Sequence, residues 1–476
     1  MHPNSLRKNQ IIDLTFTGMT AEGSAVGRCQ TQDGPGEAVF VPLGAVGDTA
    51  RVKIVKAAKT HAFGRLEEII SPAPCRVEPD CPVYAKCGGC CFRHITYEAE
   101  LAQKEQRLRD ALIRVGGFAG SQPGGASFPL QPILAAPSRS GYRNKALLPI
   151  GPGPAPGEVE LGFYAGRSHR IVPCGACLLH PGPFRMAVEA FRRWQKTAKE
   201  SVYNEQSHTG KLRRLYLRMA EATGQVLVSL VVNGTSLKGE AELVEEMRRS
   251  VPGLVGVALN QNTRRTNVAL GPTNRVLWGQ GYVVDRLQVG AGPSLEFQVS
   301  PLSFYQVNRQ QAERLYTLAA ELAGLSGGEL LLDLYCGTGT IGLSMAHLAG
   351  SLVGVEVVPQ AVENAWENAR RNGISNARFL CADAAQAAKQ LAEQGQRPDI
   401  IILDPPRKGC DAELVEAVVQ MAPQRVIYIS CDPATLARDL ARFAQLGYEP
   451  QLAAPVDMFP GTGHVETIVL LQRENS

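Results

Sequence analysis

The last third of this 476-residue chain alternates apolar, strand-length runs with helix-like segments, and this pattern limits the fold more than any other feature. The apolar runs lie at 330–335, 352–357, 377–381, 399–403, 425–430, about 448–457 and 464–472. Runs without polar alternation indicate strands that are buried on both faces. The pattern therefore predicts an α/β fold with a doubly wound sheet, which binds ligands at the carboxyl ends of its strands.

The turn after the first of these strands has a cofactor-binding pattern. It reads D-x-x-C-G-x-G from Asp333, includes Gly337 and Gly339, and precedes a strand with Glu356 at its end, 23 residues after Asp333. Glycine lets the backbone approach a ligand, and an acid at the end of the second strand can accept hydrogen bonds from a ribose diol. A Gly-x-Gly turn alone is equally typical of an ordinary connection. The whole order resembles the S-adenosylmethionine loop of class I methyltransferases more than the loop of nicotinamide enzymes, so we expect S-adenosylmethionine as cofactor.

Composition narrows the class of protein. The chain is 44% hydrophobic and 20% charged, and it has no apolar run near the roughly 18 residues of a membrane span. It also has no apolar leader, so we expect a cytoplasmic protein without a membrane partner. The net charge is only +4, so any nucleic acid must be bound by local basic patches. Twelve cysteines are few for a disulfide scaffold, and clustered cysteines in such a protein indicate metal binding or catalysis.

The N-terminal part reads as a small all-β barrel. Short alternating runs with glycine-rich turns between them occupy Ile11–Phe16, Ala38–Pro42, Thr49–Val55 and Phe63–Ile70. A basic stretch without intervening acids crosses the last two runs: Arg51, Lys53, Lys56, Lys59 and Arg65. Such a stretch is either a solvated edge that discourages strand pairing or a barrel face that follows a phosphate backbone.

Five of the twelve cysteines lie between Cys75 and Cys91, with the core pattern C-x5-C-G-G-C at Cys81, Cys87 and Cys90. A four-thiolate site needs one more ligand, and the other close pair is Cys174 and Cys177. Four thiolates suit zinc or a 4Fe–4S cluster. The five-residue spacer fits the paired C-x2-C of zinc knuckles poorly. An iron–sulfur cluster is therefore the first expectation, zinc the second, and unligated buried thiols the third.

The middle of the chain suggests RNA contacts. Residues 95–115 read as a charged amphipathic helix, a Gly/Pro/Ser-rich linker continues to about 129, and mixed strands and helices continue to about 298. Basic side chains cluster here near aromatic ones, a combination that suits phosphates and unstacked bases. The clusters are Arg139, Arg143 and Lys145 around Tyr142; Arg167 and Arg170; and Lys211, Arg213, Arg214 and Arg218.

Four reactive groups follow strands of the C-terminal sheet. Asp383 follows the third strand, within reach of an adenine amino group, Asp404 begins D-P-P-R after the fourth, Cys431 follows the fifth, and Glu466 begins the last. Asp432 and the proline after it suit the start of a helix at 434–443, so we expect the helix dipole to lower the pKa of the Cys431 thiol. A thiolate that adds to C6 of uracil activates C5 toward a methyl donor, and a carboxylate such as Glu466 can then remove the C5 proton. The alternatives for these two residues are a packing cysteine and a strand-edge salt bridge.

Together these motifs resemble the RNA uracil-5 methyltransferases, specifically the ribosomal type with a TRAM domain and an iron–sulfur cluster. The resemblance rests on C-x5-C-G-G-C, SFYQVN at 303–308, DLYCGTGTIG, LDPPRKG, YISCDPATLARDL and HVE, and runs nearly end to end. It implies Cys431 as nucleophile, Glu466 as base, and Gln306, Tyr335, Glu356 and Asp404 at the cofactor, next to Gly337, Thr340 and Asp383 of the loop and strand ends. It also implies Cys81, Cys87, Cys90 and Cys177 as cluster ligands, with Cys174 able to replace Cys177. The family often has asparagine where this chain has Asp432, although both residues cap helices.

The implied architecture is a Rossmann-like seven-stranded methyltransferase domain at 299–476, an OB-like TRAM barrel at 5–71 and a central α+β iron–sulfur and RNA-binding domain at 72–94 and 130–298. The helix and linker at 95–129 would pack on the catalytic domain. The implied partner is RNA, with large-subunit ribosomal RNA ahead of transfer RNA, bound by a monomer that holds a flipped uridine from a single-stranded loop. Two other classes stay open: a small-molecule or protein methyltransferase, and a catalytically inactive RNA-binding factor.

Overall fold

The fold is given by a computed structural model that describes residues 6–31, 34–120, 125–155 and 157–473. The chain forms two compact units. The first contains Met1–Arg107 with the short segments Tyr164–Ser168 and Phe459–His464. The second contains Leu108–Phe163, His169–Met458 and Val465–Ser476. The finer division into four parts that the sequence suggests stays a prediction.

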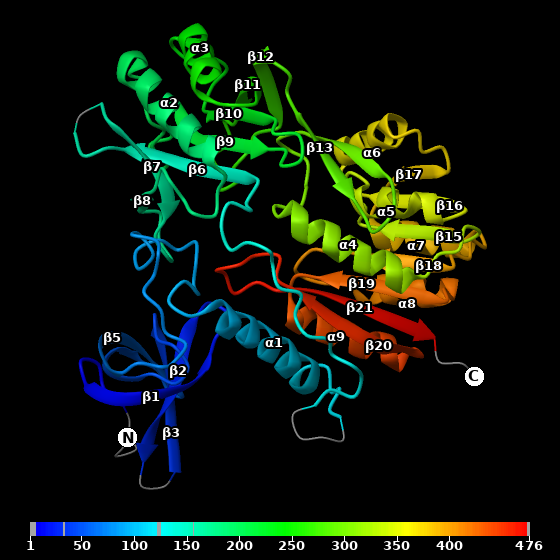
Figure 1. The fold of residues 1–476 in the computed structure, drawn as a ribbon, viewed down its shortest axis with the longest axis horizontal. Coiled ribbons are helices and arrows are strands. Elements are labelled where there is room, and N and C mark those ends of the chain that lie inside the picture. Colours follow the sequence, from blue (N-terminus) through cyan, green and yellow to red (C-terminus); the bar gives the residue numbers. More distant parts are fainter. Residues whose placement is uncertain (1–5, 32–33, 121–124, 156, 474–476) are drawn as a thin grey trace. The chain divides into compact units, whose positions relative to one another are not determined.

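The first unit is built on a closed five-stranded barrel in the order β1-β2-β3-β5-β4 (Figure 1). Its core comes from alternate residues, among them Phe16, Val39, Val52 and Ile54, while their neighbours face outward. The predicted barrel is confirmed, but β2 was missed because its sequence SAVGRCQT has little apolar alternation. The strands are β1 Ile11–Met19, β2 Ser24–Thr31, β3 Gly34–Pro42, β4 Thr49–Ala57 and β5 His61–Ser71.

A buried carboxylate joins the barrel to the segment that follows it. Asp48 accepts hydrogen bonds from the backbone N–H groups of Ala45 (2.7 Å) and Ala73 (2.8 Å) and from the Arg76 guanidinium. Helix α1, Tyr97–Arg114, confirms the predicted charged helix. Near its start, Glu100 and Lys104 form a fully buried ion pair of 2.8 Å.

The second unit contains two seven-stranded sheets. The first is mixed, in the order β12-β11-β10-β9-β6-β7-β8, and its central strand β10 is buried along its whole length. Helices α2 and α3 cover this sheet, and Phe184, Phe191, Leu243 and Met247 pack into one core with its strands. Its elements are β6 Lys145–Pro152, β7 Val159–Tyr164, β8 Ile171–Pro173, α2 Gly182–Ala198, β9 Leu212–Met219, β10 Val226–Val232, α3 Glu240–Ser250, β11 Leu254–Gln261 and β12 Thr273–Gly279.

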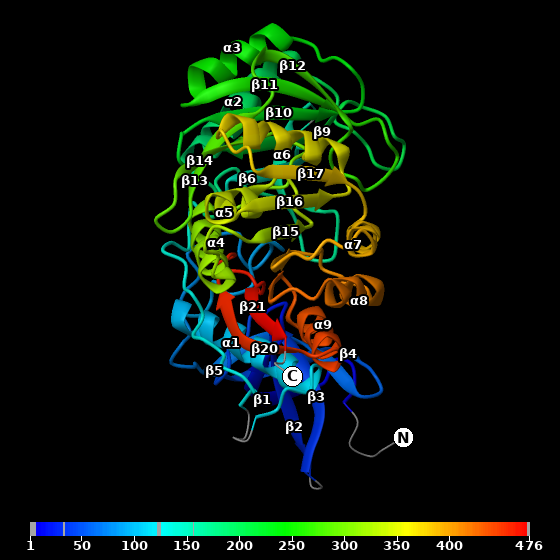
Figure 2. The ribbon, with the colours of Figure 1, turned by 90° about the vertical axis from the view of Figure 1, so that its right-hand side faces the viewer.

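The second sheet is the predicted doubly wound sheet, in the order β17-β16-β15-β18-β19-β21-β20. Five neighbouring strands are parallel, and β21 runs antiparallel to both β19 and β20. Figure 2 shows α7, α8 and α9 on one face and α4 and α5 on the other. Every predicted strand is present within two residues: β15 Leu330–Leu334, β16 Ser351–Glu356, β17 Ala377–Cys381, β18 Ile400–Leu403, β19 Arg425–Ser430, β20 Tyr448–Val456 and β21 Glu466–Arg473.

Four helices of this sheet begin where the sequence provides a capping side chain. The side chains of Asn308, Asp383, Asp411 and Asp432 accept backbone N–H groups at the starts of α4, α7, α8 and α9. The helices are α4 Arg309–Ala323, α5 Thr340–Met345 with a 3-10 turn at Ala346–Leu348, α6 Pro359–Arg371, α7 Ala384–Glu393, α8 Ala412–Met421 and α9 Pro433–Gln445. A hairpin of β13 Val283–Gln288 and β14 Ser294–Val299 precedes α4. Among the described residues, no helix has the length and apolarity needed to cross a membrane.

Candidate active site

The reactive groups predicted from the sequence gather at one edge of the doubly wound sheet because its central strands are parallel. Leu403, the last residue of β18, pairs with Leu334 of β15 and with Tyr428 of β19. Tyr335 and Asp404 therefore begin neighbouring loops. Ser430 of β19 pairs with Thr467 of β21 in antiparallel register. Cys431 follows Ser430 and Glu466 precedes Thr467, and the charge of Glu466 acts on the Cys431 thiol.

The loop after β15 has the backbone shape of a ligand cradle. Tyr335, Gly337 and Gly339 all have positive φ angles, of 71°, 56° and 82°. This conformation is unusual for a tyrosine and indicates a backbone held under local strain. A Cβ atom on Gly337 would meet no atom within 4 Å, so this glycine leaves open space beside the loop. Glu356 at the end of β16 accepts hydrogen bonds from the backbone N–H groups of Gly337 (3.1 Å) and Val358 (2.8 Å).

The surroundings of this loop fit S-adenosylmethionine. Two buried oxygens, Asp333 Oδ1 and Thr338 Oγ1, have no hydrogen-bond partner among the described protein groups. Two apolar side chains next to Glu356 are largely exposed, Val357 at 61% and Val358 at 51%, as expected of a surface for a flat ring. Asp383 begins α7 at the same edge, and its Oδ1 atom accepts the backbone N–H of Ala385. The acid, the apolar side chains and the open glycine therefore suit a ribose, a base and a close backbone approach.

Gln306 lies buried in the loop before α4, and the mixed sheet supports this loop. Asn144, just before β6, donates from Nδ2 to the Gln306 carbonyl (2.9 Å). Its Oδ1 atom accepts from Arg218 of β9 (2.8 Å), and Arg218 also reaches the Ser303 carbonyl (3.3 Å). Arg218 is fully buried, so its predicted role as a surface phosphate contact is wrong. Instead, it fixes the segment that carries Gln306.

The prediction that the α9 dipole lowers the pKa of Cys431 is also wrong. Burial, followed by the charges of Glu466 and Asp404, raises the pKa of this thiol to about 11, and Arg407 opposes the shift. The physical reason is that burial and these two carboxyls outweigh the field of α9, whose start is occupied by Asp432. Its anionic side chain accepts the N–H groups of Ala434 and Thr435, both at 3.0 Å, so these donors and their positive field are already compensated.

The two carboxyl groups beside Cys431 are also perturbed. Burial, with a further contribution from Asp404, raises the pKa of Glu466 to about 8. Burial raises the pKa of Asp404 to about 7. Arg407 lowers the pKa of both Glu466 and Cys431 and is thus the cation that acts on this pair. The site combines a thiol, two carboxyls that exchange protons near neutral pH and one guanidinium, which suits nucleophilic addition followed by proton removal.

Sequence reasoning assigned no role to Tyr316 of α4, which the structure places beneath the site. Its hydroxyl is buried and hydrogen-bonded to Thr340, the first residue of α5. Burial raises its pKa, and the charges of Asp404, Asp333 and Glu466 raise it further. No sequence signal distinguishes this tyrosine from an ordinary core residue on an amphipathic helix. Arg407, in contrast, was visible in the sequence as the last residue of the D-P-P-R motif.

Comparison with known proteins places this site in a family. The family model described as tRNA (Uracil-5-)-methyltransferase matches residues 236–474, and the TRAM domain model matches residues 6–66. A relative from Clostridium tetani, named an uncharacterized RNA methyltransferase, is 39% identical over 466 residues, which cover 98% of this chain and 97% of the relative. The chain belongs to the RNA uracil-5 methyltransferase family. It is therefore an S-adenosylmethionine-dependent enzyme that acts on RNA.

Further relatives of this RNA methyltransferase agree along its whole length. A Gloeobacter violaceus protein, also named an uncharacterized RNA methyltransferase, is 39% identical over 473 residues. The match covers 99% of this chain and 99% of that protein. The solved structure of Pyrococcus abyssi tRNA (uracil-54, C5)-methyltransferase in complex with S-adenosyl-L-homocysteine is 25% identical. It matches with a TM-score of 0.76 over 97% of this chain and 100% of that chain.

The cysteines predicted as metal ligands in this methyltransferase belong to both units. All twelve cysteines belong to the described residues, and none of them forms a disulfide. Cys81, Cys87 and Cys90 lie on one loop of the first unit, where Cys87 N–H donates to the Val83 carbonyl (2.8 Å). Within the described ranges, no group of three or more His, Cys, Asp or Glu side chains is arranged to hold a metal ion.

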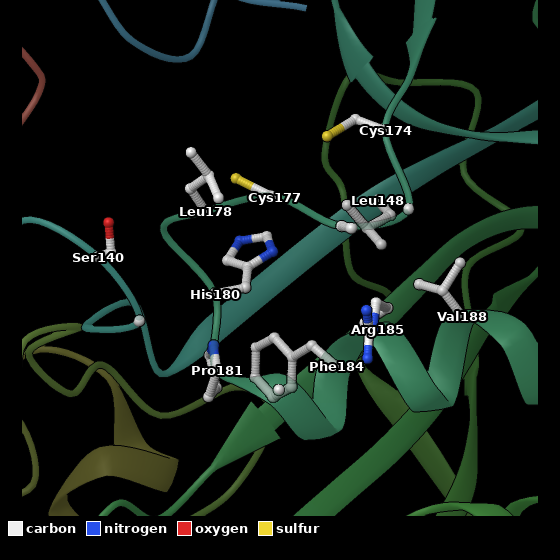
Figure 3. Close-up of a pocket in the computed structure, with 14 residues that line it drawn as sticks. Ser140, Leu148, Cys174, Cys177, Leu178, His180, Pro181, Phe184, Arg185 and Val188 are labelled. Carbon is white, nitrogen blue, oxygen red and sulfur yellow. The ribbon is translucent and has the colours of Figure 1, made fainter. Parts of the chain in front are cut away.

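Cys177 belongs to the second unit, on the loop between β8 and α2 (Figure 3). This loop lines a cavity of about 410 Å³ together with Leu148, Phe184 and Val188. A hydrogen bond with Cys174, together with burial, raises the pKa of the Cys177 thiol. The two thiols are close enough to interact, so the choice between them as a ligand stays open.

The predicted basic stretch of the barrel is partly neutralised. Arg51 pairs with Asp13 (3.2 Å) and Glu68 (2.8 Å), and Arg65 pairs with Glu67 (2.7 Å). In the part of the chain that the structure describes, the three lysines of this stretch make no ion pair. Within this stretch, the charges available to RNA are therefore those of Lys53, Lys56 and Lys59.

Proposed function

We propose that this enzyme methylates C5 of a uridine in RNA through a covalent bond between Cys431 and C6 of the base. The observation that carries the proposal is the electrostatic interaction of the Glu466 carboxyl with the Cys431 thiol, at the residues next to the last pair of the β19–β21 ladder, Ser430 and Thr467. Amino-group methylation requires neither group, whereas C5 methylation requires both. Asp404 and Arg407 act electrostatically on the same pair.

The first step is addition of the Cys431 thiolate to C6. The S–C6 bond forms, and the electrons of the C5–C6 double bond move to C5 and the C4 oxygen as an enolate. Because the thiol pKa is about 11 before substrates bind, the site must favour loss of its proton. Arg407 acts in this direction, and the positive sulfonium of the methyl donor adds to it. The proton leaves through the carboxyl pair of Asp404 and Glu466 to solvent.

The second step joins C5 to the methyl group as the sulfur–methyl bond of S-adenosylmethionine breaks and S-adenosylhomocysteine leaves. In the last step, ionised Glu466 takes the C5 proton, the electron pair restores the C5–C6 double bond, and the C6–S bond breaks to release Cys431. A pKa of about 8 suits this role, because a carboxylate of that basicity accepts a proton more readily than an ordinary one.

We further propose large-subunit ribosomal RNA as the substrate, with the uridine flipped from a single-stranded loop, as the sequence motifs suggest. Transfer RNA is the second candidate, since the solved relative is named for a tRNA uracil. The match to that relative covers 97% of this chain, including the barrel. The presence of the barrel therefore does not distinguish a ribosomal RNA enzyme from a transfer RNA enzyme. Mapping 5-methyluridine in ribosomal and transfer RNA from cells with and without the protein tests the choice. The lost modification identifies the substrate.

A 4Fe–4S cluster is proposed on Cys81, Cys87, Cys90 and Cys177. Three ligands on one short loop and a fourth elsewhere match the four thiolates that such a cluster needs, and methyl transfer itself requires no electron. The cluster would therefore be structural. Anaerobically purified protein should be brown and contain iron, and should lose its colour on prolonged oxidation. Stoichiometric zinc without iron would refute the proposal. Cytoplasmic location and a monomeric state stay predictions of the sequence.

The decisive experiment for the reaction is trapping on RNA that contains 5-fluorouridine. Fluorine replaces the proton that Glu466 must remove, so the methylated adduct cannot resolve. A species of protein linked to RNA should survive a denaturing gel and require S-adenosylmethionine. Peptide mapping should place the link at Cys431. An inactive RNA-binding factor or a methyltransferase of another class would give no such species.

A further inference from the structure

One buried acid near the site has no part in the mechanism above. Asp439, in the second turn of α9, is fully buried, and both of its carboxylate oxygens accept hydrogen bonds. Its Oδ2 atom accepts from the backbone N–H of Cys410 and from the Tyr428 hydroxyl, both at 2.8 Å. Its Oδ1 atom accepts from Arg438 Nε (2.9 Å) and Arg442 (3.4 Å). Such a carboxylate is fixed from two sides and is costly to remove.

The first segment that Asp439 holds is the loop after β18. Gly409 N–H donates to the Pro406 carbonyl (2.8 Å), which closes a turn with Arg407 and Lys408 at its corners. Gly409 has a φ of 74°, and a Cβ atom there would lie 2.2 Å from Asp439 Oδ2. The turn and the acid therefore fit each other only with glycine at this position.

The arginines that flank Asp439 hold the same turn by its carbonyls. Arg438 donates to the Lys408 carbonyl (2.8 Å), and Arg442 donates to the Cys410 carbonyl (3.2 Å). The backbone from Lys408 to Cys410 is thus bonded to α9 at both its N–H and C=O groups. Arg407, the first corner residue of the turn, is carried by this fixed backbone.

The second segment that Asp439 holds is the strand of the nucleophile. Tyr428 is a buried residue of β19, three positions before Cys431, and its hydroxyl bonds to the same oxygen that accepts Cys410 N–H. One carboxylate oxygen therefore joins the strand that ends at the thiol to the turn that carries the guanidinium. Asp432, the residue after Cys431, caps the same helix.

We propose that Asp439 is a positioning residue that holds Arg407 at a fixed place relative to Cys431 and Glu466. The proposal rests on the proposed roles of those two residues. Asp439 touches neither reacting atom; it acts through the turn from Pro406 to Gly409. A carboxylate serves here because it accepts amide, hydroxyl and guanidinium donors together, which a neutral side chain of the same size cannot do.

The test is the pH profile of Cys431 alkylation by iodoacetamide, followed by mass spectrometry of the Cys431 peptide. The charged groups that face this thiol are Glu466 from β21 and Asp404 and Arg407 from the loop after β18. In Asp439→Asn the side-chain NH2 group replaces one of the two accepting oxygens and faces hydrogen-bond donors. The turn therefore loosens, and Arg407 moves away from Cys431. The alkylation midpoint should rise by about one unit, the lower end of the effect of a nearby opposite charge. The methylation kcat should fall by about ten- to a hundredfold.

A double-mutant cycle separates positioning from general stability. If Asp439 acts through Arg407, Arg407→Ala and Asp439→Asn should be strongly non-additive, and the double variant should resemble Arg407→Ala alone in midpoint and kcat. Independent, additive effects would overturn the proposal. So would an Asp439→Asn protein that loses thermal stability but keeps the wild-type alkylation profile and kcat.

Two further variants keep the test decisive. Asp48→Asn removes a matched carboxylate, since Asp48 of the barrel is also fully buried and bonded to an arginine and two amides. It should reduce stability without moving the Cys431 profile. If Asp439→Asn does not fold, Tyr428→Phe removes one bond to the same oxygen and should give a smaller shift in the same direction; no shift would overturn the proposal. Failure of the wild type to form a Cys431 adduct with 5-fluorouridine RNA would instead reject the proposed function.

Discussion

The two seven-stranded sheets of the second unit use their polar residues differently. In the doubly wound sheet the central strands are parallel, so Tyr335, Asp404 and Cys431 follow three neighbouring strands and meet at one edge. In the mixed sheet β9 is antiparallel to both β6 and β10, so its strand ends point in alternate directions. Two of its cations, Lys145 and Arg218, lie opposite each other in the ladder, and burial followed by the like charge of Arg218 lowers the pKa of Lys145.

Because of this difference, the doubly wound sheet carries the reactive residues and the mixed sheet supports them. A parallel sheet concentrates the residues after its strands, and a strand followed by an acid or thiol therefore predicts a site. In the mixed sheet a basic residue on a strand is as readily buried as exposed. Arg218 bonds to Asn144 and Ser303, and it holds the loop of Gln306 rather than a phosphate. The five predictions below test this contrast, from the largest expected effect to the smallest.

The largest effect is expected at the parallel edge. Cys431→Ala should reduce methylation by roughly a thousandfold or more, because the variant cannot form the C6 bond, and S-adenosylmethionine binding should stay nearly unchanged. Single-turnover assays and calorimetric cofactor titration measure the two properties. Cys381→Ala, at the exposed end of β17 on the same sheet, is the matched control. Substantial activity in Cys431→Ala would reject the nucleophile.

Glu466→Gln should stop the reaction later. The adduct forms and the methyl group transfers, but the C5 proton stays because glutamine cannot accept it. A protein–RNA species with the labelled methyl group should accumulate on a denaturing gel with ordinary uridine RNA, which Cys431→Ala cannot give. A variant that forms no adduct at all would show that Glu466 is not the resolving base.

The same carboxyl should make stability depend on pH. Folded Glu466 keeps its proton up to a pKa of about 8, above the usual value of 4.5, so the folded state binds more protons than the unfolded one between these values. Stability should therefore fall as pH rises from 4.5 to 8, by on the order of 4 kcal/mol for this group alone. Urea unfolding at several pH values measures the slope. In Glu466→Gln only the share of this group should disappear, because Asp404 and Asp333, whose pKa values burial raises to about 7 and about 8, keep their own shares. An unchanged slope would contradict the assignment.

A smaller effect is expected in the mixed sheet. Asn144→Ala removes the bonds to the Gln306 carbonyl and to Arg218 and leaves a buried guanidinium with fewer partners. Stability should fall by about 3 kcal/mol, and KM for S-adenosylmethionine should rise several-fold while 5-fluorouridine trapping still occurs at saturating cofactor. Asn260→Ala removes another buried asparagine of this sheet, bonded to Gly271 and Asn274, and should affect stability alone. Equal KM values for S-adenosylmethionine in the two variants would show that the mixed sheet does not position the loop of Gln306.

The smallest effect is expected on the barrel. Lys53→Gln with Lys56→Gln should raise the apparent KM for long RNA and reduce the slope of log affinity against log salt by somewhat under one unit per lysine, with cofactor affinity unchanged. Arg51→Gln is the control, since its charge is already paired with Asp13 and Glu68 and should contribute less. An unchanged salt slope in the lysine variant would make this surface an ordinary solvated edge.

Much of this protein is determined by local sequence. Apolar runs place the seven strands of the catalytic sheet, and Asn308, Asp383, Asp411 and Asp432 mark the starts of its helices. Parallel connection of the central strands then brings their following residues together, so the candidate site could be predicted from order alone. β2 of the barrel was missed because its glycine and polar residues form no alternating pattern. Pairing with β1 and β3 makes this segment a strand.

Tertiary structure alone decided the electrostatics. Whether a charge is buried, paired or exposed depends on residues distant in sequence, and a pKa follows from all of them. Burial, followed by Glu466 and Asp404, reverses the pKa shift expected for Cys431, and distant acids neutralise Arg51. Arg218 is buried, where it bonds to the loop that carries Gln306. Asp439 looked like one more polar residue of an amphipathic helix. Only the fold shows that the turn of Arg407 and the strand of Cys431 converge on its carboxylate, because they reach it from 29 and 11 positions away in the chain.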